Sequence, residues 1–98
     1  MTQNLIIRPE AERDIFSAYD WYEGQRRGLG ADFATELSKS MDQIIELPKM
    51  YSVLYRGIRR ALLKRFPFGI YYLVQGNANF VLAVHHLAMD PEKWKRRK

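Results

Sequence analysis

The sequence predicts an α+β fold: an N-terminal strand and a helical hairpin, then a mostly antiparallel sheet with a short C-terminal helix. Two patterns support this. Apolar residues recur at helical spacing across residues 9–47, and strand-like runs replace them between residues 52 and 86. Asp90-Pro91-Glu92 then supplies a capping residue and a proline suited to the first turn of a helix. We expect residues 1–98 to form one domain.

The apolar run from Asn4 to Arg8 is expected to form the first strand. Pro9 suits the first turn of the following helix, because its missing N–H would be unpaired there anyway. That helix should run to about Glu23, and the helix dipole favours acidic residues in its opening turns. Phe16 and Trp21 lie off the centre of the apolar stripe, so we expect them at the surface. The acidic residues are Glu10, Glu12 and Asp14, and the stripe comprises Ala11, Ile15, Ala18, Tyr19 and Tyr22.

A connector from Gly24 to Gly30 is expected between the two helices, with positive φ angles available at Gly24 and Gly28. The second helix should run from about Ala31 to Leu47, and Pro48 stops it. Its apolar residues keep helical spacing, so the two helices should form a hairpin with one apolar face. These residues are Phe33, Leu37, Met41, Ile44 and Ile45.

Strands are expected at residues 52–55, 58–66, 69–75 and 80–86, with a hairpin turn at 75–79. Adjacent residues on a strand point to opposite faces, so Tyr71 and Tyr72 should separate, as should His85 and His86. We therefore expect one of the two histidines to be buried and the other to be available at the surface.

The chain carries 16 Lys and Arg residues against 11 Asp and Glu, and its net charge is +5. The acidic residues fall mostly before Pro48 and the basic ones after it. This asymmetry suggests an anionic partner: nucleic acid, a nucleoprotein machine or an acidic protein. The absence of cysteine excludes disulfides and thiolate metal sites. Because two adjacent strand histidines chelate poorly, we expect no metal site and no cofactor.

The segment from Met1 to Leu5 lacks the basic-then-apolar pattern of a signal peptide. The longest weakly charged stretch, residues 66–89, is interrupted by Pro67, Gly69 and the turn at 75–79. We therefore expect a cytoplasmic protein without a membrane span.

Several short motifs follow one another along nearly the whole chain, at Pro9–Ile15, Tyr19 with Trp21-Tyr22, Phe33, Ile44 and Pro48, Ile58–Arg60, Phe66–Tyr72, Val81–His86 and Asp90–Trp94. In their order and spacing they resemble the RelE/ParE toxin superfamily, and more closely its ParE-type plasmid-stabilisation branch. This resemblance implies a growth-inhibiting toxin of a type II toxin–antitoxin system. A ParE-type toxin would bind and poison DNA gyrase without being an enzyme. A cognate antitoxin would neutralise it in a hetero-oligomer, and only the antitoxin would link it to operator DNA.

The candidate contact residues follow from this reading, since tryptophan and arginine are frequent anchors at protein interfaces. The tail from Arg96 to Lys98 is expected to be a flexible, solvated run of charge. The predicted target-binding residues are Trp21, Arg26, Arg27, Arg59, Arg60 and Trp94, and the predicted antitoxin-binding residues are Phe16, Tyr19, Lys64 and Arg65.

Two alternatives remain open from the sequence. A RelE-like nuclease would cleave mRNA on the ribosome without metal, which needs an acid, a base and cations near the phosphate. Arg60, Arg65 and His86 are its candidate catalytic residues. Against it, Phe68, Leu87-Ala88 and Met89 stand where nuclease members often carry an arginine, a late tyrosine and a second arginine. The other alternative is a non-toxic binding module of the same fold.

Overall fold

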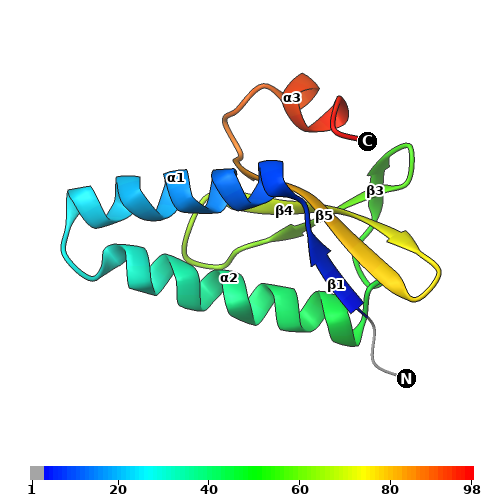
Figure 1. The fold of residues 1–98 in the computed structure, drawn as a ribbon, viewed down its shortest axis with the longest axis horizontal. Coiled ribbons are helices and arrows are strands. Elements are labelled where there is room, and N and C mark those ends of the chain that lie inside the picture. Colours follow the sequence, from blue (N-terminus) through cyan, green and yellow to red (C-terminus); the bar gives the residue numbers. More distant parts are fainter. Residues whose placement is uncertain (1–3) are drawn as a thin grey trace.

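The computed structural model describes residues 4–98 as a mixed sheet with helices on both of its faces (Figure 1). Met1–Gln3 lie outside the described residues, so the expectation for the N-terminal segment is untested there. In chain order the elements are β1 Asn4–Ile7, α1 Pro9–Gln25, α2 Leu29–Glu46, β2 Val53–Tyr55, β3 Ile58–Leu62, β4 Phe68–Gln75, β5 Ala78–His86 and α3 Pro91–Lys95.

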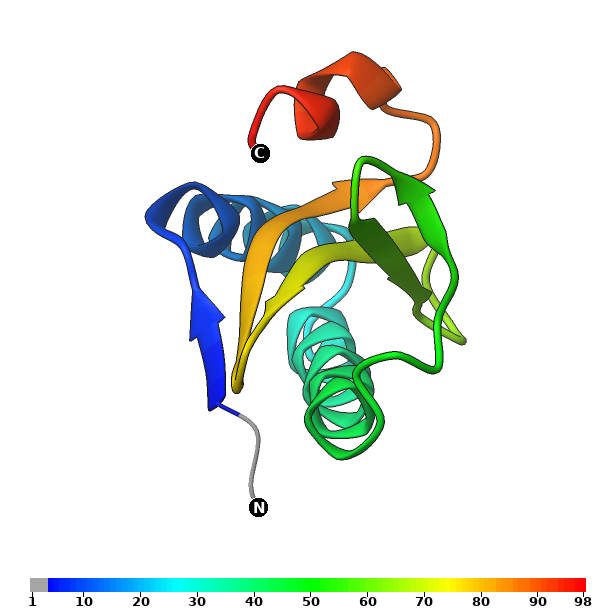
Figure 2. The same cartoon turned by 90° about the vertical axis from the view of Figure 1, so that its right-hand side faces the viewer.

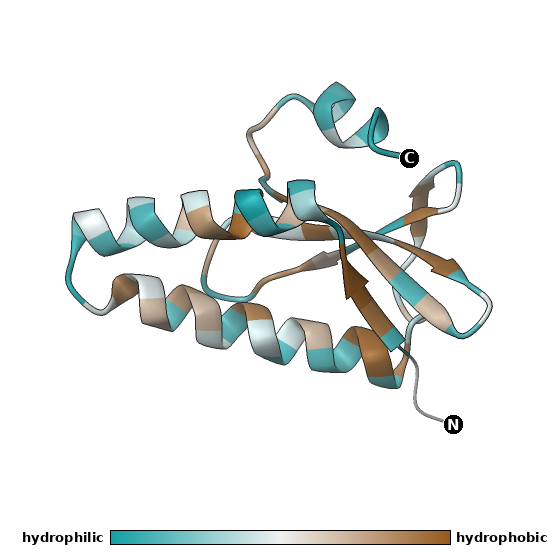
Figure 3. Ribbon diagram, in the orientation of Figure 1, coloured by the Kyte–Doolittle hydropathy of each residue, from teal (hydrophilic) through white to brown (hydrophobic). Residues whose placement is uncertain are grey.

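The strand order across the sheet is β1-β5-β4-β3-β2. β1 runs parallel to β5, and the other three pairings are antiparallel, which confirms the predicted fold class. The α1–α2 hairpin covers one face of the sheet, while α3 lies beyond the other (Figure 2). In Figure 3, hydrophobic segments concentrate on the strands between these two layers, whereas α3 is mostly hydrophilic. Two apolar clusters therefore fill the two sides of the sheet.

The helices of the hairpin approach each other closely at Gly30. A Cβ there would lie 2.9 Å from the backbone oxygen of Tyr19, so the contact requires glycine. The carboxylate of Glu23 accepts the N–H groups of Gly28 and Gly30, each at 3.0 Å, and so satisfies backbone donors at the start of α2. Gly28 has the expected positive φ of 89°. The expectation for Gly24 was wrong, because α1 continues past it to Gln25.

Four aromatic rings form the core between the hairpin and the sheet near the α1–α2 connection. The ring of Tyr22 stacks on that of Phe33, with centroids 5.4 Å apart, and meets Phe66 edge-on at 4.8 Å. Phe68 completes the group, 5.1 Å from Phe33. The rings anchor the C-terminal half of α1 to the start of β4.

The expected strand at residues 58–66 is shorter in the structure, because β3 ends at Leu62. Phe66 turns into the aromatic core, and Pro67 has no N–H to offer the sheet. Residues 63–67 therefore form a connection, which places Lys64 and Arg65 outside the sheet. The alternation expected for a strand over residues 58–66 would put Lys64 on the same face as Arg60 and Arg65 on the same face as Arg59, and the end of β3 at Leu62 rules this out.

The two tyrosines of β4 separate as predicted, Tyr72 toward the helices and Tyr71 toward α3. The Tyr72 hydroxyl donates to the backbone oxygen of Pro48 at 2.7 Å.

Burial raises the pKa of Tyr72 to about 12. Because the folded chain holds this proton more tightly than the unfolded chain, Tyr72 stabilises the fold fully below about pH 10, and the stabilisation is lost as the pH rises toward about 12. Chemical denaturation of the wild type and of Tyr72→Phe between pH 9 and 12 should show a steeper fall for the wild type. Equal slopes would contradict this assignment.

Candidate functional site

The end of the helical hairpin gathers exposed aromatic and cationic side chains. Trp21 is 61% exposed and Phe16 is 65% exposed, so both lie at the surface as expected. Arg26 and Arg27 follow in the short connection between α1 and α2, and both are exposed. Trp21, in the last turns of α1, and Arg26 and Arg27, just after its end at Gln25, thus belong to one segment of seven residues at the end of the hairpin.

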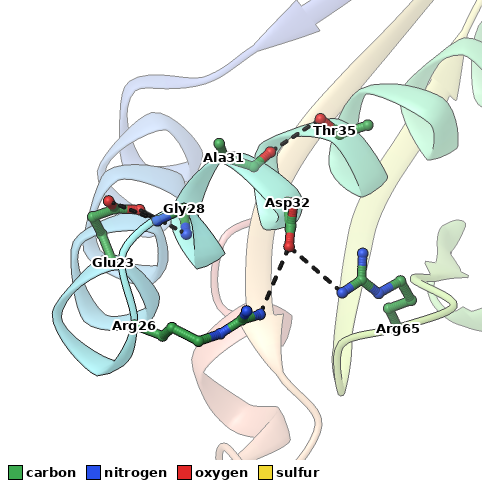
Figure 4. Close-up of polar contacts among 8 residues, drawn as sticks. Glu23, Arg26, Gly28, Ala31, Asp32, Thr35 and Arg65 are labelled. Carbon is green, nitrogen blue, oxygen red and sulfur yellow. Dashed lines mark hydrogen bonds and ion pairs between the residues drawn. The ribbon is translucent and has the colours of Figure 1, made fainter.

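Asp32 on α2 links this connection to the loop between β3 and β4 (Figure 4). Its Oδ2 lies 3.9 Å from Nη2 of Arg26 and 3.6 Å from Nη2 of Arg65. All three side chains are about half exposed, so each ion pair adds at most about 1 kcal/mol of stability. The two guanidinium groups are therefore held near each other but weakly enough to move to another anion.

A pocket with a volume of about 500 Å³ opens beside Trp21. It lies between α1 and the end of the sheet at which β4 begins and β5 ends. We call it the ring pocket. Its lining is almost wholly apolar, and the titratable side chains in that lining are those of Tyr22 and His86. The Nδ1 atom of His86 accepts the N–H of Ala88 at 2.9 Å, which fixes the imidazole at the edge of the pocket. The lining residues are Ala18, Trp21, Tyr22, Pro67, Phe68 and His86.

Trp94 is buried, which corrects its expected place among the surface contact residues. It is 5% exposed, and its ring stacks on Tyr71 with centroids 4.5 Å apart and an interplanar angle of 18°. Tyr55 meets it edge-on at 6.3 Å. Trp94 is thus the side chain through which α3 packs on the sheet.

The carboxylate of Asp14 accepts a hydrogen bond from the backbone of β5 just beyond the point where β1 ends. β1 pairs with β5 only as far as Val81, which leaves the next backbone groups on that edge without a strand partner. The N–H of Val84 donates to Asp14 Oδ2 at 3.0 Å, and Nη1 of Arg97 donates to the oxygen of Leu82 at 3.0 Å. Two side chains therefore replace the missing strand along this part of β5.

Arg97 and Asp14 also bind each other. Nη1 of Arg97 donates to Oδ2 at 2.5 Å and Nη2 donates to Oδ1 at 3.2 Å, a two-point contact between a guanidinium and a carboxylate. Nζ of Lys98 donates to the backbone oxygen of Arg56. The expectation of a flexible tail was therefore wrong at Arg97 and Lys98, which attach the C-terminal segment to α1, β5 and the β2–β3 turn.

His85 is the buried histidine of the adjacent pair, with 2% exposure, and His86 is exposed, as predicted. Nε2 of His85 lies 3.3 Å from Asp14 Oδ2, and within residues 4–98 its Nδ1 has no hydrogen-bond partner. Burial by itself raises the pKa of Asp14, but the hydrogen bonds from His85, Arg97 and Val84 outweigh it and hold the pKa below 3.8. Asp14 is therefore charged at neutral pH.

The comparisons with known proteins identify the family. The model of the ParE toxin of the type II toxin–antitoxin system parDE matches residues 5–91. The chain belongs to the ParE toxin family. Among solved structures, it resembles one described as the chromosomal ParDE TA system from P. aeruginosa. The two share 17% sequence identity with a TM-score of 0.76, over 86% of this chain and 95% of that one. No curated protein matches significantly in sequence.

The three nuclease candidates are not assembled into one site in this ParE-family chain. The side chain of Arg60 lies over Gly69, where an added Cβ would meet its Cγ and Cδ at 3.0 Å. Arg65 turns toward Asp32 of α2, and His86 borders the ring pocket. Each borders a different hollow of the surface. An acid, a base and a phosphate-binding cation therefore do not converge from these residues.

The other predicted contact residues are scattered. Nη1 of Arg59 donates to the backbone oxygens of Lys49 and Tyr51, at 3.3 and 2.5 Å, so it supports the segment before β2. Tyr19 is half-buried on α1, and Lys64 is exposed beside Arg65. Together with α2 residues, Lys64 and Arg65 border a second hollow of about 270 Å³.

Sequence patterns did not reveal Asp14, Pro67 or Phe68 as residues of these sites. Asp14 was assigned to the helix dipole, and nothing local indicates a partner 83 residues away. No helix within residues 4–98 is long and apolar enough to cross a membrane. In the same part of the chain, no three acidic or histidine side chains cluster as metal ligands.

Proposed function

We propose that this ParE-family chain arrests growth in the cytoplasm by binding DNA gyrase, without catalysing a reaction itself, and that a cognate antitoxin neutralises it. The observation that carries the proposal is the family match over residues 5–91. The dispersion of Arg60, Arg65 and His86 over separate parts of the surface supports binding over RNA cleavage.

The target-binding surface in this proposal is the hairpin end, formed by Trp21, Arg26 and Arg27. These side chains are exposed, belong to one short segment of the chain and combine two residue types that are frequent interface anchors. Arg59 and Trp94 are withdrawn from the proposed contact because their side chains are engaged within the chain. Arg60 remains available through its half-buried side chain on β3.

The antitoxin in this proposal lays an acidic, amphipathic segment over the toxin. Lys64 and Arg65 supply positive charge beside the hollow along α2, and Phe16 offers an exposed apolar side chain on α1. Such a segment folds as it binds, so it can cover separated patches of one surface.

Inducible expression in a bacterial host tests the mechanism. Plasmid topoisomers, gyrase–DNA breaks and total mRNA should be followed in one time course with culture growth. The expected result is growth arrest with trapped gyrase–DNA breaks and intact mRNA. A variant carrying Trp21→Ala, Arg26→Gln and Arg27→Gln should lose the arrest while accumulating to the same level as the wild type.

Two outcomes would overturn the proposal. Growth arrest with codon-positioned mRNA cuts and normal DNA would favour the RelE-like nuclease and its residues Arg60, Arg65 and His86. Unimpaired growth with soluble protein present would favour a non-toxic binding module.

A further inference from the structure

From the uncovered edge of β3 and the two hollows beside it, we infer that this chain binds an extended peptide of alternating acidic and apolar residues. The peptide adds to the sheet as a further strand, along the part of β3 that β2 does not cover. In the proposed function this peptide is a segment of the antitoxin, and only that attribution rests on the proposed function.

Within residues 4–98, the outer edge of β3 has no strand partner at its C-terminal end. β2 pairs with β3 at Ile58 and Arg59 and no further. The N–H of Leu63 donates to the backbone oxygen of Phe68, so the alternation of an antiparallel ladder turns the N–H and C=O of Leu62 to the outer edge. Leu62 is 49% exposed. A second chain can therefore reach these backbone groups and pair with them as a strand.

Two hollows flank this edge on opposite faces of the sheet. Tyr51 and Leu62 border both, so the hollows meet there. The hollow of about 270 Å³ along α2, here called the basic hollow, lies on the face that the helices cover. Ala61 packs in the core on that face, so its neighbours Arg60 and Leu62 point to the other one. The leucine hollow, of about 260 Å³, is lined by Tyr51, Ser52, Leu54, Arg60 and Leu62.

The basic hollow fits an acidic side chain. Lys39, Lys64 and Arg65 line it, against the single carboxylate of Glu36. Within residues 4–98 neither lysine forms an ion pair, and both are exposed. The pair of Arg65 with Asp32 is 3.6 Å long and half exposed. A carboxylate that enters this hollow therefore gains charge-assisted hydrogen bonds without breaking a strong contact.

The leucine hollow fits an apolar side chain. Leu54 and Leu62 are 45% and 49% exposed, so their aliphatic surface is open to a partner. The stem of Arg60 lies over Gly69 and adds further apolar surface beside them. Because side chains alternate between the two faces of a strand, a peptide with acidic and apolar residues in turn fills both hollows at once.

A nucleic acid is the other anionic guest for these cations, and the edge and the leucine hollow argue against it. A phosphodiester chain carries no N–H and C=O groups at strand spacing to pair with Leu62. Base stacking needs a free aromatic face, whereas the exposed side chains of the leucine hollow are aliphatic. Its one ring, that of Tyr51, is half-buried, and the hydroxyl donates to Oε1 of Gln43 at 3.0 Å.

Titration of the full chain with a fluorescent peptide of about nine residues, alternating glutamate and valine, tests the site. Fluorescence anisotropy measures the affinity near 0.15 M salt. Lys39→Gln with Lys64→Gln should weaken binding by about five-fold or more, because two cations of the basic hollow are lost. Leu62→Ala should weaken it by about five-fold through lost apolar contact.

Matched controls come from other exposed residues of the chain. Lys93→Gln with Arg96→Gln removes two exposed cations of the C-terminal segment, and the affinity should stay at the wild-type value. Leu87→Ala truncates a leucine that is 44% exposed and lies outside both hollows, so it should also bind like the wild type.

Three measurements separate strand addition from attraction between charges alone. A peptide of the same composition, with its glutamates and valines in two blocks, should bind about ten-fold more weakly. N-methylation of one alternate set of peptide N–H groups should weaken binding by about ten-fold, whereas methylation of the other set, which faces away from β3, should be tolerated. Amide exchange at Leu62 should slow when the alternating peptide binds.

The inference is wrong if the block peptide, or both methylated peptides, bind as tightly as the alternating one, or if exchange at Leu62 is unchanged at saturation. It is equally wrong if the double lysine variant binds like the wild type, or if oligothymidylate binds this site where the peptide does not. None of these readouts uses gyrase or the antitoxin, so a failure here leaves the proposed arrest and its neutralisation to tests in cells.

Discussion

Replacing Trp94 with alanine is expected to lower the free energy of unfolding by about 3–5 kcal/mol. The substitution removes a nearly fully buried indole, its stacking on Tyr71 and its contact with Tyr55. A five-residue helix has little stability of its own, so α3 should detach from the sheet when this anchor is removed. Urea denaturation followed by far-ultraviolet circular dichroism measures the change.

The chain supplies a matched control in its other tryptophan. Trp21 is largely exposed, so Trp21→Ala should change the free energy of unfolding by less than about 1 kcal/mol. If the two alanine variants lost the same stability, the packing of α3 on the sheet described here would be wrong.

Replacing Asp14 with alanine should lower the free energy of unfolding by about 2–4 kcal/mol. The change leaves the N–H of Val84 and the guanidinium of Arg97 without their acceptor, and it removes the partner of His85. Arg97→Ala should cost less, because the Val84 N–H keeps its bond to Asp14. The double variant should be more stable than the sum of the two losses predicts, since the side chains interact directly.

The dependence of this effect on pH follows from the pKa of Asp14. That pKa is held below its unfolded value of 3.8, so the stabilisation is present above about pH 4 and disappears as the pH falls through the folded pKa. The stability difference between wild type and Asp14→Ala should shrink in that acidic range. Asp20→Ala, an exposed change on the same helix, should be nearly neutral at every pH. A comparable loss in Asp20→Ala would contradict the special role of Asp14.

Local patterns predicted the elements that depend on local chemistry. The spacing of Ala11, Ala18 and Tyr22 predicted the buried face of α1, and all three are buried. The side chain of Asp90 accepts the N–H of Glu92 at 3.0 Å, which confirms the predicted N-terminal cap of α3. The predicted end of β3 was wrong because Phe66 packs against Tyr22 and Phe33 in the aromatic core. The alternation of residues within its own segment does not show these contacts.

The sites depend on contacts between residues far apart in the chain, which explains what the sequence did not predict. Trp94 lies 23 residues from the Tyr71 ring on which it stacks, and a basic tail gives no sign that Arg97 binds α1. The ring pocket likewise joins the middle of α1 to Pro67 and His86. Trp21, Arg26 and Arg27 could be predicted together because they lie in one short segment.

Incubation of the purified protein with purified DNA gyrase and a supercoiled plasmid tests the central claim most directly. The account predicts that gyrase–DNA cleavage complexes accumulate with the wild-type protein, and that they decline when Trp21, Arg26 and Arg27 are replaced. Stable, folded protein that leaves gyrase unaffected while cutting mRNA on purified ribosomes would contradict it.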